Sequence, residues 1–204
     1  MGRRRLRRPP VRTYSQGMTT ARSVHHTYAD YLAVEKDSPV RHEYFDGEIF
    51  AMAGGTPEHA ALAVQLAVLL QTRLPPGGRA FSSDLKVRIE ASGLTTYPDL
   101  SVVCGPVDRA EGDPNAITNP SLLVEVTSPS SEDYDRGEKL THYQQLPSLQ
   151  AVLVVSHRLH QVTVVERTAA RWSQRTCAAG GQVELASPRV AFEVDELYRA
   201  LAGL

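Results

Sequence analysis

Hydrophobic and polar positions in the first part of the chain predict a helix, a hairpin and a longer helix. Thr27 can cap a helix that runs through about Glu35. Two β-rich segments, residues 41–45 and 48–52, flank Asp46-Gly47, the strongest short hairpin signal. Residues 57–74 are apolar on nearly every side. This pattern predicts a helix that is buried around most of its circumference.

Period-two alternation then predicts a sheet. Leu85, Val87 and Ile89 share one face of a strand over residues 79–90, and a further strand is expected over residues 95–104. Residues 105–119 are rich in proline, glycine and aspartate and predict an irregular loop. Residues 122–127 form a short apolar run that is typical of a buried central strand.

The rest of the chain completes a mixed architecture. We expect a polar helix from Ser130 to about Leu146 and a strand over residues 150–156. An antiparallel meander over residues 161–167, 171–177 and 182–185 follows, and a short helix over residues 195–201 closes the chain. From residue 57 onward the order is α-β-β-β-α-β. The sequence therefore predicts an α/β (α+β) fold with a mixed β-sheet flanked by helices, an N-terminal hairpin and a C-terminal meander.

Charge is distributed unevenly along the chain. The formal net charge is −1, but residues 1–17 hold six arginines and no acid, which leaves 16 basic against 23 acidic residues, a net of −7, in the remainder. We expect residues 1–25 to be a basic, disordered arm or sequence upstream of a true start at Met18. Residues 26–204 are predicted to form one domain.

Several classes of protein do not fit the sequence. No apolar run approaches the roughly 20 residues of a membrane-spanning helix, and no apolar segment of a secretory signal follows the arginines. The two cysteines, Cys104 and Cys177, lie in separate segments without zinc-ligand spacing, so we expect a cytoplasmic protein. No Gly-x-Ser-x-Gly elbow of a serine hydrolase and no phosphate-binding glycine loop is present.

Two acidic residues lie in unusual places. Asp99 follows Pro98 inside an apolar segment, and Glu125 lies in the middle of the most buried predicted strand. An unpaired carboxylate there would cost several kcal/mol or would be neutralised by a shift of its pKa. On adjacent strands the pair would form a pocket of hard oxygen ligands for Mg²⁺ or Mn²⁺. The alternative is a structural role, as an ion pair with arginine or as an acceptor for loop amides.

An ordered set of segments carries a family resemblance over about residues 26–200. The segments are HEYFDGE (42–48), PEH (57–59), SDLKV (83–87), YPD (97–99), NP (119–120), VEVTSPS (124–130), DRGEK (135–139), LPSL (146–149) and DELY (195–198), together with Tyr143. In this order they resemble the bacterial Uma-two family of proposed restriction endonucleases, within the PD-(D/E)XK nuclease superfamily. The resemblance implies a restriction-endonuclease-like core.

What the resemblance implies for chemistry is divalent-metal-dependent hydrolysis of phosphodiester bonds. Asp99 and Glu125 would hold Mg²⁺ or Mn²⁺, with the backbone carbonyl of Val126 as a further ligand. Glu43 is the candidate for an additional acid; the alternative is a half-exposed hairpin residue. The superfamily's lysine position, two residues after Glu125, is occupied by Thr127, which cannot supply a positive charge.

Two lysines are candidates to replace the missing one. Lys139 shares a helix face with Asp135, Arg136 and Tyr143, and Lys86 projects from the polar face of its strand. For each lysine the alternative is an ordinary solvated ion pair. Beside them, His59, Arg136 and Tyr143 are candidates to contact the metal ligands or the phosphate, and the alternative for His59 is a helix-end residue.

The sequence therefore predicts a divalent-metal-dependent endonuclease that acts on DNA as a homodimer, since two active sites cut two antiparallel strands most simply. The main alternative is a catalytically inactive binding or assembly module that retains the nuclease fold, which Thr127 favours. A metal-dependent hydrolase with a substrate other than nucleic acid is a third possibility.

Overall fold

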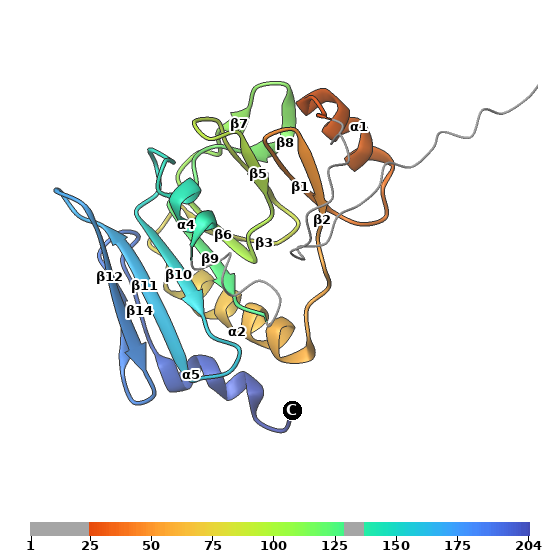
Figure 1. Cartoon of the computed structure of the whole chain (residues 1–204). Coiled ribbons are helices and arrows are strands. Elements are labelled where there is room, and N and C mark those ends of the chain that lie inside the picture. The colour runs from red at the N-terminus through yellow and green to blue at the C-terminus, as the bar shows by residue number, and fades with distance from the viewer. Residues whose placement is uncertain (1–24, 129–136) are drawn as a thin grey trace, which may run out of the picture. The chain divides into compact units, whose positions relative to one another are not determined.

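The computed structural model describes residues 25–128 and 137–204, and these divide into two compact units with the boundary between Ala53 and Gly54 (Figure 1). The smaller unit contains α1 (Tyr28–Asp37) and the antiparallel strands β1 (His42–Phe45) and β2 (Glu48–Ala51). Residues 1–24, where the basic arm is predicted, lie outside the described residues.

Local signals in the smaller unit are confirmed. Thr27 caps α1 through a reciprocal pair of hydrogen bonds, in which its hydroxyl accepts from the Asp30 N–H (3.2 Å) and the Asp30 carboxylate accepts from the Thr27 N–H (2.8 Å). Asp46 and Gly47 both have positive φ angles, 46° and 76°, as the predicted two-residue hairpin turn requires.

The larger unit is built on a central mixed sheet with the strand order β12-β11-β10-β9-β6-β3. Strands β9 and β10 run parallel, and the other neighbouring pairs run antiparallel. The strands are β3 (Gly78–Ser82), β6 (Leu100–Cys104), β9 (Leu122–Val126), β10 (Ala151–Val155), β11 (Gln161–Arg167) and β12 (Trp172–Ala178).

Helices lie on both faces of this sheet, which confirms the predicted α/β class (Figure 1). Helix α2 (Pro57–Arg73) places Leu62, Leu66 and Leu70 in one core with Val124 and Val126 of β9. The short helix α5 (Val194–Tyr198) and the hairpin of β13 (Gln182–Leu185) and β14 (Val190–Glu193) complete that core. The connection from β9 to β10 contains α4 (Glu138–Tyr143).

Two predicted strands are each broken in two. The segment 79–90 becomes β3 and β4 (Lys86–Ile89) because a turn intervenes, in which the Leu85 N–H bonds the Ser82 carbonyl (3.0 Å) and the Asp84 N–H bonds the Ser82 hydroxyl (3.3 Å). The segment 95–104 becomes β5 (Leu94–Thr96) and β6, because Pro98 between them has no N–H to donate to a ladder.

One half of each broken strand, β4 and β5, belongs to a second sheet that the sequence did not predict. Within the larger unit its order is β5-β4-β8-β7, with β7 (Arg109–Ala110) and β8 (Asp113–Ile117) lying in the segment predicted as an irregular loop. Strand β8 is polar at alternate positions and pairs in parallel with β4, a long-range contact that leaves only a weak local signal.

The C-terminal part differs from the prediction in one respect. Strands β11, β12 and β13 lie where expected, but β13 pairs with β14 in a separate two-stranded sheet instead of extending the meander. A single turn of 3₁₀ helix (Arg199–Leu201) follows α5. The predicted helix from Ser130 begins outside the described residues, and α4 ends at Tyr143, before the predicted end at Leu146. No helix in the described ranges is long and apolar enough to cross a membrane.

Two neighbouring positions of α2 test the role of this helix in the core. Leu66 is fully buried, whereas Val64 and Val68 are 65% and 53% exposed. The prediction that this helix is buried around most of its circumference is therefore wrong, because only one face packs against the core. We expect Leu66→Ala to lower the free energy of unfolding by about 3 kcal/mol because it leaves a cavity. Val64→Ala should change it by less than about 0.5 kcal/mol. Urea denaturation followed by circular dichroism measures both, and equal losses would contradict the assigned face of the helix.

Candidate active site

The antiparallel pairing of β6 and β9 brings Asp99 close to the end of β9. Leu100 pairs with Val124 at the last position of this ladder, and Asp99, which directly precedes β6, accepts a hydrogen bond from the Val126 N–H through its side chain. The two acidic residues therefore lie at the ends of neighbouring strands, as the sequence predicted.

Asp99 is held by a backbone amide and by a histidine. Its Oδ2 atom accepts a hydrogen bond from the Val126 N–H (2.7 Å) and lies 3.1 Å from Nε2 of His59. Thr56 caps α2 by accepting from the His59 N–H (3.3 Å), which places this histidine in the first turn. Gly55 packs against the imidazole, because a Cβ atom there would lie 2.6 Å from Nδ1.

The backbone of Val126 faces the same edge. Thr127 donates its N–H to the Val155 carbonyl of β10 (2.8 Å). Successive residues of a strand direct their backbone groups to opposite neighbours, so the N–H and carbonyl of Val126 point to the side of Asp99. The hydrogen bond from the Val126 N–H to Asp99 agrees with this direction.

Glu125 is buried and contacts α4, which lies on the face of the central sheet opposite to α2. Its Oε1 atom lies 2.9 Å from Nζ of Lys139 and accepts a hydrogen bond from the hydroxyl of Tyr143. The Lys139 ammonium also lies 6.0 Å from the centre of the Tyr143 ring. The structure thus brings together three residues that the sequence singled out. The ion pair is with a lysine, not with the arginine that the structural alternative assumed.

Lys86 lies in a second buried ion pair, 2.8 Å from the carboxylate of Asp113 on β8. The side chains of Lys86 and Lys139 are only 5% and 6% exposed, so the alternative of a solvated ion pair is wrong for both. Asp113 was missed because its segment was predicted as a loop. A buried lysine needs an acidic partner, and that requirement is the signal that could have pointed to it.

Thr127, in the lysine position, is fully buried and belongs to a chain of three side chains. Its hydroxyl lies 2.9 Å from Nδ1 of His157 and accepts from the His157 N–H (3.3 Å). Arg158 donates its Nε–H to Nε2 of His157 (3.0 Å). Sequence reasoning missed this arrangement, because the threonine and the histidine are 30 positions apart.

Two other predicted site residues lie outside the described part of the larger unit. Glu43 lies on β1 in the smaller unit and is 8% exposed, so the alternative of a half-exposed residue is wrong, while its role as an additional acid stays a prediction. Arg136 lies outside the described residues.

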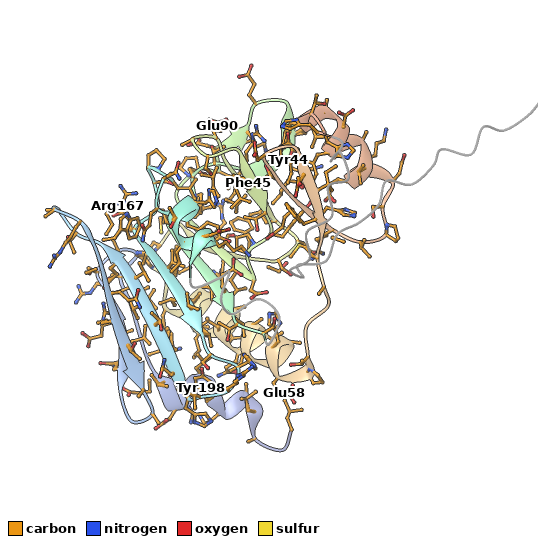
Figure 2. The ribbon with its side chains drawn as sticks, in the orientation of Figure 1. Tyr44, Phe45, Glu58, Glu90, Arg167 and Tyr198 are labelled. Carbon is orange, nitrogen blue, oxygen red and sulfur yellow. The ribbon has the colours of Figure 1, made fainter. Side chains whose placement is uncertain are left out.

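An arginine fixes the segment that follows α4. Arg167, at the end of β11, donates to the carbonyls of Leu149 (2.8 Å), Leu146 (2.7 Å) and Gln144 (3.4 Å), and its guanidinium lies 4.8 Å from the ring of Trp172. Figure 2 shows Arg167 at one end of the central sheet, with Glu58 and Tyr198 toward the other end. These contacts tie the helix that carries Lys139 to the sheet.

The donors at the Asp99 edge are of the kind that hard cations bind. They are the carboxylates of Asp99 and Glu125 and the carbonyl of Val126, and oxygen ligands of this type suit Mg²⁺ and Mn²⁺. Across residues 25–128 and 137–204, no group of three or more His, Cys, Asp and Glu side chains comes together as potential metal ligands.

Comparisons with known proteins point in one direction. The family model Uma2, described as "Putative restriction endonuclease", matches residues 28–196. Two uncharacterized proteins of Synechocystis, slr1290 and sll1609, are 39% and 30% identical, over 85% and 78% of this chain and 91% and 90% of their own. A crystal structure of a putative nuclease of DUF820 from Anabaena variabilis has a TM-score of 0.67 at 18% identity, covering 80% of this chain and 93% of that one, and shows the same fold.

Removing one member of the buried Glu125–Lys139 pair tests how strongly it is coupled. We expect Lys139→Met to lower the free energy of unfolding at pH 7 by about 3 kcal/mol, because the carboxylate stays buried without its ammonium. The double variant Lys139→Met/Glu125→Gln should recover part of this loss. Arg171→Met, at an exposed position of the same unit, is the control and should have little effect. Urea denaturation of the native protein, these three variants and the single variant Glu125→Gln gives the comparison, and additive effects of the two single substitutions would show that the pair is uncoupled.

Proposed function

Because the chain belongs to the Uma2 family of putative restriction endonucleases, we propose that it is a divalent-metal-dependent endonuclease that hydrolyses phosphodiester bonds. Family membership and fold support a nuclease. The observation that supports the metal-dependent reaction is that Asp99, next to β6, bonds the backbone of Val126 directly after Glu125 on the neighbouring strand β9.

Asp99, Glu125 and the Val126 carbonyl are the residues that would hold Mg²⁺ or Mn²⁺. A bound ion would polarise the phosphate and would lower the pKa of a water molecule. Among the described residues, the contacts of Asp99 with His59 and the Val126 N–H both use Oδ2, and Oδ1 is the atom proposed to bind the ion. His59 and the Val126 N–H keep the carboxylate in one orientation, so little reorganisation is needed when substrate binds.

Lys139 is the residue proposed to supply the positive charge that Thr127 cannot. Its ammonium lies beside Glu125 and is anchored by α4, whereas Lys86 is engaged with Asp113 on the second sheet. Burial strengthens the field of an ammonium, because little water screens it. Tyr143 holds the shared Glu125 oxygen from the same helix.

Three finer points belong to the same proposal. DNA is the proposed substrate, since the family is described in terms of restriction endonucleases. A homodimer is proposed because two sites related by a two-fold axis match two antiparallel strands. The proposed location is the cytoplasm, where the nucleic acid lies.

One observation favours a second candidate function, a catalytically inactive binding or assembly module. The hydroxyl of Thr127 is engaged with His157 and brings no charge to the strand that carries Glu125. Under this alternative Glu125 and Lys139 would be a purely structural ion pair. The two functions differ in their need for a metal, because only the nuclease uses Asp99 and Glu125 to bind one.

Nicking of supercoiled plasmid in Mg²⁺ or Mn²⁺ tests the nuclease. We expect metal-dependent nicking by the native protein and a loss of at least about 100-fold in Asp99→Asn and Glu125→Gln, since each substitution removes a charged ligand that contributes several kcal/mol to the transition state. Glu111→Gln, on the exposed turn between β7 and β8, is the control and should retain full activity.

Nicking that persists in both site variants would show that these carboxylates do not hold the ion. If no condition gives cleavage, calorimetric titration of Mn²⁺ into the native protein and into Asp99→Asn separates the remaining alternatives. The absence of binding by either protein would leave the inactive module as the function.

A further inference from the structure

The carboxyl ends of the parallel strands β9 and β10 lie side by side, at the edge that contains Asp99. Val126 pairs with Val155 at the last position of the ladder, and the Thr127 N–H continues the pairing to the Val155 carbonyl (2.8 Å). The two arrowheads in Figure 1 point the same way. Ligands of α/β proteins bind outside the carboxyl ends of such strands.

The chain of side chains at this edge orients one cation. The guanidinium of Arg158 donates from Nε to Nε2 of His157, so this ring nitrogen accepts and the neutral imidazole carries its proton on Nδ1. Nδ1 then donates to the hydroxyl of Thr127. Thr127 is buried at the end of the sheet strand, so it fixes the orientation of the His157 ring. The ring in turn orients the guanidinium of Arg158.

The turn that carries Arg158 is itself held in place. The hydroxyl of Ser156 accepts from the N–H groups of Arg158 (3.2 Å) and Leu159 (3.1 Å). The hydroxyl of Tyr198 lies 2.6 Å from the carbonyl oxygen of Ser156 and 2.8 Å from that of Gln161, and its single proton can be shared between them. A side chain on such a turn loses less conformational entropy on binding than one on a free loop.

The edge is acidic, but the positively charged guanidinium of Arg158 is available there to bind an anion. Glu58 lies near His157, and its pKa is lowered mainly by the hydrogen bond from the Thr56 hydroxyl. Together with Asp99 and Glu125 it makes the edge acidic, which opposes the approach of a polyanion. Among the described residues, the hydrogen bond of Arg158 goes to a neutral ring, so no bonded carboxylate offsets its charge.

We infer that Arg158, oriented by His157 and Thr127, binds a backbone phosphate of the nucleic acid beside the Asp99–Glu125 site. The inference rests on the proposed nuclease function and adds a residue that positions the substrate. With Nε bonded to His157, the terminal nitrogens of the planar guanidinium can contact two oxygens of one phosphate. A contact of this kind fixes the register of the strand and reads no base sequence.

Salt dependence of DNA binding tests the contact without relying on cleavage. Fluorescence polarisation with a labelled 30-base-pair duplex in EDTA, between about 50 and 300 mM NaCl, gives the slope of log K against log salt. That slope is negative, and we expect Arg158→Ala to make it about 0.9 less steep, which is the contribution of one phosphate of duplex DNA. Arg189→Ala, at an exposed position in the β13–β14 connection, should leave the slope unchanged.

The chain of hydrogen bonds is tested by a double-variant comparison. Thr127→Val removes the partner of His157 and should weaken duplex binding about 2–5-fold in the native background and not at all in the Arg158→Ala background. His157→Phe, which removes both ring nitrogens at a half-buried position, should behave in the same way and guards against a folding defect of the buried threonine variant.

The two proposals fail in distinguishable ways. An unchanged slope in Arg158→Ala, an equal reduction in Arg189→Ala, or no binding of the duplex by the native protein would overturn the phosphate contact. Nicking by the native protein together with an unchanged slope would leave the nuclease standing without this contact. A reduced slope in a protein that neither cleaves DNA nor binds Mn²⁺ would support the contact and reject the nuclease.

Discussion

A carboxylate in the middle of a buried strand is the constraint on which the rest of the larger unit depends. Glu125 is tolerated there because Lys139 and Tyr143 both reach its Oε1 atom from α4. An isolated charge at that depth would cost several kcal/mol, so the helix must lie where it does for β9 to occupy the centre of the sheet. Arg167 of β11 bonds three carbonyls in the segment after α4, so the position of this helix also depends on β11.

The interruption of a strand creates the second half of the site. Pro98 cannot extend the ladder of β6, and the Val126 N–H on the neighbouring strand bonds the carboxylate of Asp99. A residue that would otherwise be covered by backbone pairing is thus left at the sheet edge, 16% exposed and in contact with His59. The same break sends β5 into the second sheet, so the irregularity shapes both the site and the architecture.

The candidate site combines groups of opposite charge whose positions are fixed separately. Asp99 and Glu125 are acidic residues at the ends of neighbouring strands and are the proposed metal ligands. Lys139 approaches from α4, and Arg158 approaches from the end of β10. This separation suits a reaction on a phosphodiester. Carboxylates must bind the metal cation, while positively charged side chains must bind the phosphates. Fold alone does not establish such a reaction, and these particular side chains are what supports it.

Sequence alone determined the features that depend on neighbours along the chain. The capping box of Thr27, the Asp46-Gly47 turn and the apolar helix α2 follow from local hydrogen bonds, backbone conformation and a single periodicity. It also identified the two acids, because a charge inside an apolar run is unusual wherever the run folds.

Tertiary structure alone decided that 79–90 divides between two sheets and that β13 pairs with β14, since strand pairing is a long-range choice. The partners of buried polar groups were likewise decided in space: Lys86 meets Asp113, and Thr127 meets His157, 30 positions away. Burial dictates that such a group finds a partner, but only the fold determines which one it finds.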